Sequence, residues 1–306
     1  MTMFIPDAFR QRYGPLVDDE DAFLACLDVL LPKSFRVNTL KSNPDDVKKR
    51  FSGYGIQIKQ MEWYEDAFVS ENPDIGATLE HFTGAIYMQE LVSMLPPLLL
   101  REELKDARFV LDACAAPGSK TTQLAAMMGN RGVIVANDSS YSRTRALKFN
   151  LEKTGAINAI ITNQDLRNFP HMQFDAILLD APCSAEGTIR KNDKLFYEWS
   201  EKSIRSQSRL QKQLITKAFE LLAPGGAMVY STCTFAPEEN EAVVDWLLQN
   251  HPEAVVEPIG EMEGLKLSPA VEEWQGTAFD AWVRKTRRIW PHHSNTGGFY
   301  LAKVRK

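Results

Sequence analysis

The sequence predicts an α/β fold, with a mostly parallel sheet, helices on both faces and a small α+β subdomain in front. From Phe109 to Gln249, short apolar runs alternate with helical stretches, a rhythm typical of parallel sheets. Two of these runs, FDAILLD at Phe174–Asp180 and AMVYSTCTF at Ala227–Phe235, have the length and apolar character of strands buried on both faces. A chain of 306 residues accommodates one large α/β domain and a smaller appendage.

The smaller appendage is expected over residues 1–105. Ser34–Leu40 alternates like an exposed strand, Pro44–Phe51 is typical of a short helix capped by Asn43, and Gln57–Val69 suits extended structure. This β-α-β order predicts a small α+β subdomain.

The larger domain is expected over residues 106–306. Pro224-Gly225-Gly226 should end its longest helix, residues 253–285 carry no strong period, and Arg288–Trp290 with Gly298–Val304 predicts a closing hairpin. Strands are expected at Phe109–Asp112, Val133–Asn137, Ala159–Thr162, Phe174–Leu179 and Ala227–Ser231, and helices at Ser119–Met128, Ser140–Thr154, Ser200–Leu222 and Glu238–Gln249.

Composition narrows the class of protein. No apolar run is long enough to span a bilayer, and the N-terminus lacks the pattern of a secretory signal, so we expect a cytoplasmic protein that does not act at a membrane. The four cysteines, Cys26, Cys114, Cys183 and Cys233, have irregular spacing, which favours neither a disulfide framework nor a metal site; we expect free thiols. A net charge of −5 argues against a surface that is basic throughout, but it permits one face that is locally basic.

The stretch Asp112–Thr122 (DACAAPGSKTT) joins a strand to a helix. Its small residues allow close approach to a ligand at the helix N-terminus. It matches neither GxGxxG nor GxxxxGK[ST], and therefore suits an adenosine-type cofactor with a carboxylate and an amine better than a dinucleotide. A tight structural turn is the alternative.

Acidic residues follow the other parallel strands. Asp138 suits hydrogen bonds from ribose hydroxyls or a helix-capping role. Asp165 suits an adenine amino group or simple solvation, and Asp180 ends a central strand. Together with Asp112 they should line one edge of the sheet, where ligands bind in open α/β folds.

Cys183 and Cys233 each lie just past the carboxyl end of an expected strand, so the two sulfurs converge if the strands are neighbours. Such a pair suggests a redox couple, half of a metal site, or covalent catalysis. No nearby histidine or further cysteine completes a metal site, and a redox couple usually has Cys-x-x-Cys spacing. Cys26 and Cys114 fit the ordinary role of buried small residues.

Covalent catalysis has a chemical reason to use both thiols. Carbon 5 of cytosine becomes nucleophilic when a thiolate adds to carbon 6, and a second group must then help remove the carbon-5 proton or release the product. Asp180 is placed to bond the ring nitrogen and amino group of the base, and Lys120 could lower a thiol pKa and orient the base.

The chain resembles the Sun/Nop family of S-adenosylmethionine-dependent RNA cytosine-C5 methyltransferases. The resemblance runs from about Pro32 to Lys306 and is carried by PKSFRVNTL, YMQELVSMLPP, DACAAPGSKTTQ, DAPCSAEGTIRK, STCT followed by PEENE, and RIWPHHSNTGGFY. It implies an RNA-recognition-like N-terminal subdomain and a Rossmann-type class I methyltransferase core.

The resemblance also implies roles for individual residues. Cys233 would be the nucleophile and Cys183 would promote product release, with Asp180 and Lys120 beside them. The residues that would contact the cofactor or target base are Cys114, Ala115, Ala116, Pro117, Gly118, Ser119, Lys120, Asp138, Arg143, Asp165 and Asp180.

The implied partner is RNA, with transfer RNA slightly favoured over ribosomal RNA. Basic residues could track phosphates or form a solvated helix face; they are Arg190, Lys191, Lys194, Lys202, Arg205, Arg209, Lys212, the run Arg284–Arg288 and the tail Lys303–Lys306. Two other classes remain open. One is a DNA or exocyclic-amine methyltransferase, and the other is a non-catalytic RNA-binding protein with a Rossmann core.

Overall fold

The computed structural model describes residues 5–306, which divide into two compact units. The parallel-sheet unit comprises residues 32–180, 217–229 and 306. The thiol-pair unit comprises residues 5–31, 181–216 and 230–305 and contains both Cys183 and Cys233. None of the helices within residues 5–306 combines the length and apolar character needed to cross a membrane.

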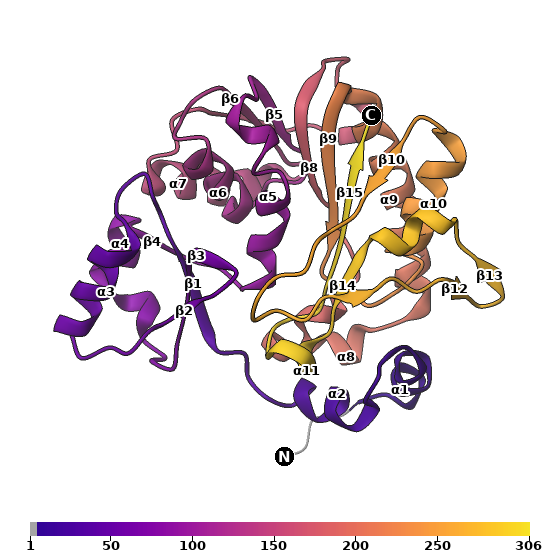
Figure 1. The fold of residues 1–306 in the computed structure, drawn as a ribbon, viewed down its shortest axis with the longest axis horizontal. Coiled ribbons are helices and arrows are strands. Elements are labelled where there is room, and N and C mark those ends of the chain that lie inside the picture. Colours follow the sequence, from indigo (N-terminus) through magenta and orange to yellow (C-terminus); the bar gives the residue numbers. More distant parts are fainter. Residues whose placement is uncertain (1–4) are drawn as a thin grey trace. The chain divides into compact units, whose positions relative to one another are not determined.

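The parallel-sheet unit contains the strands that the alternating pattern predicts. They are hydrogen-bonded in the order β9-β8-β5-β6-β7, and β8, β5, β6 and β7 run parallel. Figure 1 labels four of them, β9, β8, β5 and β6. The prediction of strands and helices between residues 109 and 180 is confirmed to within one residue at each end. The bounds are β5 Phe109–Asp112, α6 Ser119–Met127, β6 Val133–Asn137, α7 Tyr141–Thr154, β7 Ala159–Thr162 and β8 Phe174–Asp180, with α5 Leu95–Leu99 in front.

Strand β8 is buried on both faces, as its apolar run predicts. Its residues Ala176, Ile177, Leu178 and Leu179 are all fully buried. On one face, Ala176 and Leu178 belong to a core that also contains leucines from the helices α6 and α7. A central strand enclosed in this way gives the residues at its carboxyl end a rigid base.

The small subdomain is a four-stranded antiparallel sheet in the order β2-β3-β1-β4. Its helices are α3, which Asn43 caps by accepting a hydrogen bond from the N–H of Asp46, and α4. The bounds are β1 Lys33–Val37, α3 Pro44–Gly53, β2 Lys59–Met61, β3 Tyr64–Ser70, α4 Leu79–Thr83 and β4 Ile86–Met88. The expectation that β1 is an exposed strand is wrong: β1 pairs on both sides, and Phe35, Arg36 and Val37 are fully buried.

The thiol-pair unit has an aromatic core and an antiparallel sheet. Phe9, Phe23, Phe235 and Trp290 pack in it, with Phe235 and Trp290 stacked at a centroid distance of 5.3 Å. The closing hairpin is confirmed, because β14 pairs antiparallel with β15. The bounds are α1 Asp7–Tyr13, α2 Glu20–Leu27, α8 Leu195–Glu198, α10 Glu241–Asn250, β10 Val255–Glu257, β11 Ser268–Pro269, β12 Glu273–Trp274, β13 Thr277–Ala278, β14 Arg287–Ile289, α11 Pro291–Ser294 and β15 Phe299–Arg305.

Strand β9 begins earlier than its sequence predicts. Helix α9 (Glu201–Leu221) passes directly into β9 (Leu222–Thr232), so Pro224-Gly225-Gly226 lies inside the strand rather than ending the helix. The reason is at the other end of the chain, since the N–H of Gly225 donates to the carbonyl of Lys306 at 2.9 Å and the N–H of Lys306 donates to Gly226 at 3.2 Å. The last residue thus extends the hydrogen-bonded ladder past the proline.

Candidate active site

Four acidic residues lie at or just past the carboxyl ends of neighbouring parallel strands. Asp112 ends β5, Asp180 ends β8, Asp138 directly follows β6, and Asp165 comes three residues after β7. Asp112 and Asp138 are almost completely buried, at 1% and 2% exposure. The side chains of Asp165 and Asp180 keep 35% and 29% of their surface exposed. The expected acidic edge is therefore present. Two of its carboxylates are buried and two are partly exposed to solvent.

The buried part of this edge carries a negative field. Burial, together with the charges of Asp180 and Asp138, raises the pKa of Asp112 to about 7, although a hydrogen bond from Thr121 opposes the shift. Burial and the same three carboxylates also raise the pKa of the Cys114 thiol. Cys114 is thus an unreactive thiol, and the edge favours a cationic ligand.

Asp138 holds the loop between β5 and α6. Its Oδ2 accepts from the N–H of Ala116 at 3.1 Å and its Oδ1 accepts from the N–H of Ser140 at 2.9 Å. Arg143 donates to the carbonyl of Ala116 and lies 3.6 Å from Asp138. Asp138 is not the cap of α7, because the N-cap residue is Ser140 and no side chain caps that helix. Its carboxylate instead fixes the loop that Ala115, Ala116 and Pro117 form.

Gly118 completes this loop with a backbone that other residues rarely adopt. Its φ is +106°, and a Cβ placed on it would lie 3.0 Å from a methyl carbon of Leu147. A side chain at this position would be strained and crowded. The glycine lets α6 begin at Ser119 directly behind the loop.

Lys120 and Asp180 form an ion pair at the centre of the edge. The Nζ atom of Lys120 lies 2.7 Å from Oδ2 of Asp180 and also donates to Oγ of Ser93 at 3.0 Å. The Lys120 side chain is only 9% exposed, so its ammonium group is fixed beneath the more open carboxylate. Asp165 instead binds its neighbour Arg167, whose side chain and N–H both donate to it.

In the thiol-pair unit, the two cysteine sulfurs lie 3.4 Å apart and both cysteines are free and half-buried. Cys183 lies three residues past the end of β8, and Cys233 directly follows β9. The hydrogen bond with Cys233, burial and the charge of Glu239 raise the pKa of the Cys183 thiol well above its usual range. Either sulfur can be the donor in this contact.

Glu239 fixes the loop that carries Cys183. Its Oε2 accepts from the N–H of Ser184 at 3.0 Å and from Nε2 of Gln211 at 2.8 Å. The same Gln211 amide group donates to the carbonyl of Pro182 at 2.8 Å. Burial and the charge of Glu186 raise the pKa of Glu239 to about 7, against the effect of the two hydrogen bonds.

This raised pKa predicts a pH-dependent stability. The folded chain binds the Glu239 proton more tightly than the unfolded chain, so the free energy of unfolding should fall as pH rises from 4.5 to about 7. Relative to Glu239→Gln, the fall should reach roughly 3 kcal/mol, as measured by urea unfolding across this range. The exposed control Glu220→Gln should show no such trend. A wild-type stability that differs from Glu239→Gln by the same amount at every pH would contradict the assignment.

Glu186 fixes the loop that carries Cys233. Its Oε2 accepts from Oγ1 of Thr234 at 2.7 Å and from the N–H of Phe235 at 3.1 Å, and its Oε1 accepts from Tyr13 and from Trp199, each at 2.6 Å. Glu186 is 1% exposed. Four donors thus hold one buried carboxylate against the loop that follows Cys233.

The residues of the PEENE motif complete this frame, and the sequence pattern alone gave them no role. Glu238 binds Arg12, Asn240 bonds to Thr232 and Thr234, and Glu241 binds Arg288. Helix α10 begins at Glu241 rather than at the expected Glu238, because the preceding residues turn to make these contacts. A cluster of acidic residues that begins five positions after a candidate nucleophile is the signal that could have identified them.

Two of the proposed phosphate-binding arginines have other roles. Arg190 is 2% exposed and donates to the carbonyls of Val29 and Thr296. Arg288 is also 2% exposed and binds Glu241. Their assignment to RNA is therefore wrong. The residues Lys191, Lys194, Lys202 and Arg209 are exposed, as the basic-face interpretation requires.

Comparisons with known proteins identify relatives along nearly the whole chain. The family model "16S rRNA methyltransferase RsmB/F" matches residues 99–305, and the model "N-terminal domain of 16S rRNA methyltransferase RsmF" matches residues 5–91. A tRNA (cytosine(49)-C(5))-methyltransferase of Pyrococcus abyssi is 42% identical over 97% of this chain and 94% of its own length. A ribosomal RNA small subunit methyltransferase F of Escherichia coli is 41% identical over 100% of this chain, which spans 64% of that relative.

Solved structures show the same fold. A methyltransferase homologue from Pyrococcus horikoshii is 36% identical, with a TM-score of 0.85 over 98% of this chain and 93% of that one. NSun6 from the same organism has a TM-score of 0.84 over 100% of this chain and 99% of its own. Because the two sequences are only 22% identical, this similarity shows a shared fold and nothing more. The predicted family, the Rossmann-type fold class and the enzyme class are thereby confirmed. The domain division near residue 105 stays a prediction.

Proposed function

The chain belongs to the 16S rRNA methyltransferase RsmB/F family, the RNA cytosine-C5 class that uses S-adenosylmethionine, and from this premise we propose its mechanism. Cys233 adds to carbon 6 of a cytosine in RNA, carbon 5 takes the methyl group, and Cys183 assists release. Asp180 and Lys120 orient the base.

The observation that carries this mechanism is the 3.4 Å contact between the two sulfurs. The Thr-Cys motif of the family assigns the nucleophile to Cys233, and the contact brings the Cys183 thiol within reach of its sulfur. Its electron pair forms the bond to carbon 6, which makes carbon 5 electron-rich. After methyl transfer, the carbon-5 proton passes to a base and the bond between carbon 6 and sulfur breaks. Cys183 donates its hydrogen bond to the departing sulfur.

The acidic edge of the parallel-sheet unit fits S-adenosylmethionine, which carries a sulfonium and an ammonium charge and supplies an electrophilic methyl group when bound. The partly exposed carboxylates of Asp165 and Asp180 and the negative field around Asp112 suit those charges. The loop from Cys114 to Ser119 would hold the cofactor with its backbone, and Asp138 and Arg143 would keep that loop in shape.

Asp180 is also placed to recognise the target base. Its carboxylate is 29% exposed, and it precedes Cys183 by only three residues along the chain. A carboxylate accepts hydrogen bonds from the amino group of cytosine. Lys120, fixed to Asp180 at 2.7 Å, holds that carboxylate in position for the base.

We expect the substrate to be structured RNA in the cytoplasm, with the target cytosine unstacked so that carbon 6 is accessible. The relatives named above act on tRNA and on ribosomal RNA, and transfer RNA remains our slight preference. The exposed residues Lys191, Lys194, Lys202 and Arg209 are candidates for phosphate contacts.

The decisive experiment supplies S-adenosylmethionine with a radiolabelled methyl group to the purified protein together with tRNA, ribosomal RNA or DNA. We expect label in RNA only, and digestion to nucleosides should place it in 5-methylcytidine. Label in DNA, or on the exocyclic amine of cytidine, would support the other methyltransferase classes. A protein that neither binds S-adenosylmethionine in calorimetry nor transfers the methyl group would be a non-catalytic RNA-binding protein.

A further inference from the structure

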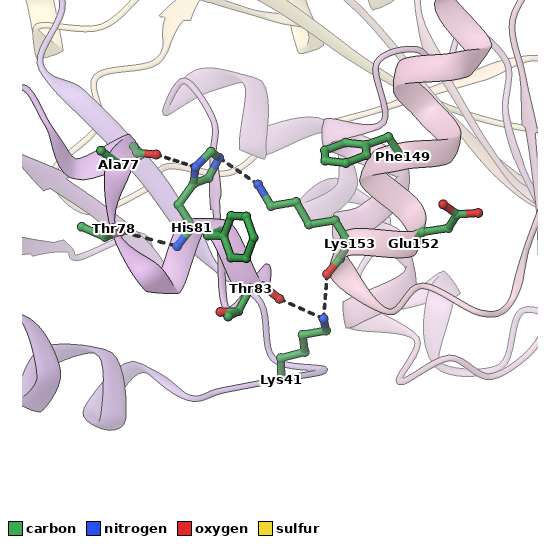
Figure 2. Close-up of a pocket in the computed structure, with 10 residues that line it drawn as sticks. Lys41, Ala77, Thr78, His81, Thr83, Phe149, Glu152 and Lys153 are labelled. Carbon is green, nitrogen blue, oxygen red and sulfur yellow. Dashed lines mark hydrogen bonds between the residues drawn. The ribbon is translucent and has the colours of Figure 1, made fainter.

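A cavity of about 650 Å³ lies within the parallel-sheet unit, between α4 with its preceding turn and the carboxyl-terminal half of α7. Figure 2 shows Lys153 reaching from α7 to the ring of His81, with Phe149 one turn earlier on the same helix. The size is in the range of small-ligand and nucleotide sites. None of its lining residues belongs to the acidic edge or to the thiol pair.

Two exposed aromatic rings line this cavity. Phe82 is 80% exposed and Phe149 is 63% exposed, and neither ring stacks on another aromatic side chain of residues 5–306. A single exposed apolar residue is ordinary, but two phenylalanines open to one cavity offer flat faces to a planar ligand. Nucleobases of unpaired RNA bind to such faces by stacking.

A fixed positive charge lies beside the rings. His81 Nδ1 lies 2.6 Å from the carbonyl oxygen of Gly76 and therefore carries the ring proton. Its Nε2 then accepts from the Lys153 ammonium group at 3.1 Å. An ammonium group has three donors, and Lys153 has no other hydrogen-bond partner within residues 5–306. Two of its N–H groups can therefore bind a phosphate oxygen.

The cavity walls are held together. The ammonium group of Lys41 donates to the carbonyls of Thr83 at 2.9 Å and of Lys153 at 2.7 Å (Figure 2). Gly84, with φ +77°, lies so near that a Cβ on it would be 2.2 Å from the Lys153 carbonyl oxygen. These contacts fix α4 against α7, so the cavity is formed before a ligand binds.

The exposed face of α7 next to the cavity carries further positive charges. Arg145 and Lys148 are exposed, and Tyr141 offers a third exposed ring at 69% exposure. Glu152 is the one acidic residue lining the cavity, and Lys148 lies 3.7 Å from its carboxylate. Alternating rings and cations along one face match the chemistry of an RNA strand better than that of a purely apolar partner.

We propose that this cavity binds one unpaired nucleobase of the RNA, stacked on Phe82 or Phe149, while Lys153 holds the adjacent phosphate. The inference rests on the proposed function for the identity of the ligand. It adds a second point of attachment, separate from the cytosine that is methylated, and so defines where a single-stranded part of the substrate is held.

The test measures binding of a fluorescein-labelled single-stranded oligoadenylate and of a fully paired RNA duplex. At least one of Phe82→Ala and Phe149→Ala should raise Kd for the single strand about tenfold, with little change for the duplex. Leu79→Ala and Ile157→Ala remove other exposed apolar side chains, at 59% and 83% exposure, and should bind like the wild type. All four positions are exposed, so thermal unfolding should be unchanged and should exclude misfolding as the cause.

Lys153→Gln tests the phosphate contact. It should lower the slope of log Kd against log salt concentration by about one, the change expected for one lost phosphate contact. Photocrosslinking of RNA that contains 4-thiouridine should label peptides of α4 and α7 in the wild type.

The outcomes separate this proposal from the proposed function. If the wild type methylates RNA while both phenylalanine variants bind single strands normally, the nucleobase site is wrong and the methyltransferase activity stands. Crosslinks that occur only outside α4 and α7 would overturn the site in the same way. If the wild type binds single strands through these residues but methylates no RNA, the proposed function fails instead.

Discussion

We expect Cys233→Ala to abolish methyl transfer to RNA, whereas Cys183→Ala should accumulate a covalent complex between protein and RNA. Without the Cys233 sulfur, no bond forms to carbon 6 and carbon 5 stays unreactive, so the loss should be at least about a thousandfold. Without Cys183, addition and methyl transfer proceed, but the departing sulfur loses the thiol that lies 3.4 Å away. A denaturing gel with labelled RNA distinguishes the two variants.

Cys26→Ala is the matched control, because Cys26 is also a free, half-buried thiol of the thiol-pair unit. It should retain wild-type activity and form no stable adduct. An adduct that persists in Cys233→Ala and never forms in Cys183→Ala would reverse the two roles. Full activity in both variants would exclude thiol chemistry.

Glu241→Ala should destabilise the protein by about 3–5 kcal/mol. Glu241 and Arg288 form a buried pair with side chains 0% and 3% exposed. The carboxylate also accepts from the N–H of Val271 at 3.0 Å. Its removal leaves the guanidinium group of Arg288 buried without a counter-charge. Urea unfolding monitored by tryptophan fluorescence measures the loss.

The double variant Glu241→Leu/Arg288→Met removes both charges and should recover much of the lost stability. Its recovery separates the cost of an unpaired charge from the cost of a changed shape. Glu102→Ala breaks the exposed pair between Glu102 and Lys105 and should change stability by less than about 1 kcal/mol. Equal losses in Glu241→Ala and Glu102→Ala would show that the buried pair contributes little.

The parallel core could be predicted because its signals are local. Strand β8 is a continuous apolar run that ends at Asp180, and the loop to Gly118 is built from small residues. Both patterns report burial and backbone geometry directly. The approach of Cys183 to Cys233 was predicted only on the condition that their strands are neighbours, and the structure meets that condition because β8 and β9 are adjacent in the sheet.

Other features could not be predicted because distant residues determine them. The early start of β9 depends on hydrogen bonds with Lys306. Arg190 looks like a surface cation in sequence, yet it donates to Val29 and Thr296. The strands between residues 255 and 278 are only two or three residues long, too short to produce a hydrophobic period.

The first helix has a practical consequence for anyone who expresses this chain in parts. Tyr13 reaches the carboxylate of Glu186 at 2.6 Å, and Arg12 reaches Glu238. A recombinant fragment that begins at Pro32, where the recognisable motifs start, would lack both contacts. Glu186 would lose the hydrogen bond from Tyr13 and Glu238 would lose its counter-ion Arg12, next to the loop that follows Cys233. Residues 5–31 thus support the loops on either side of the two thiols and should be retained in any truncated version.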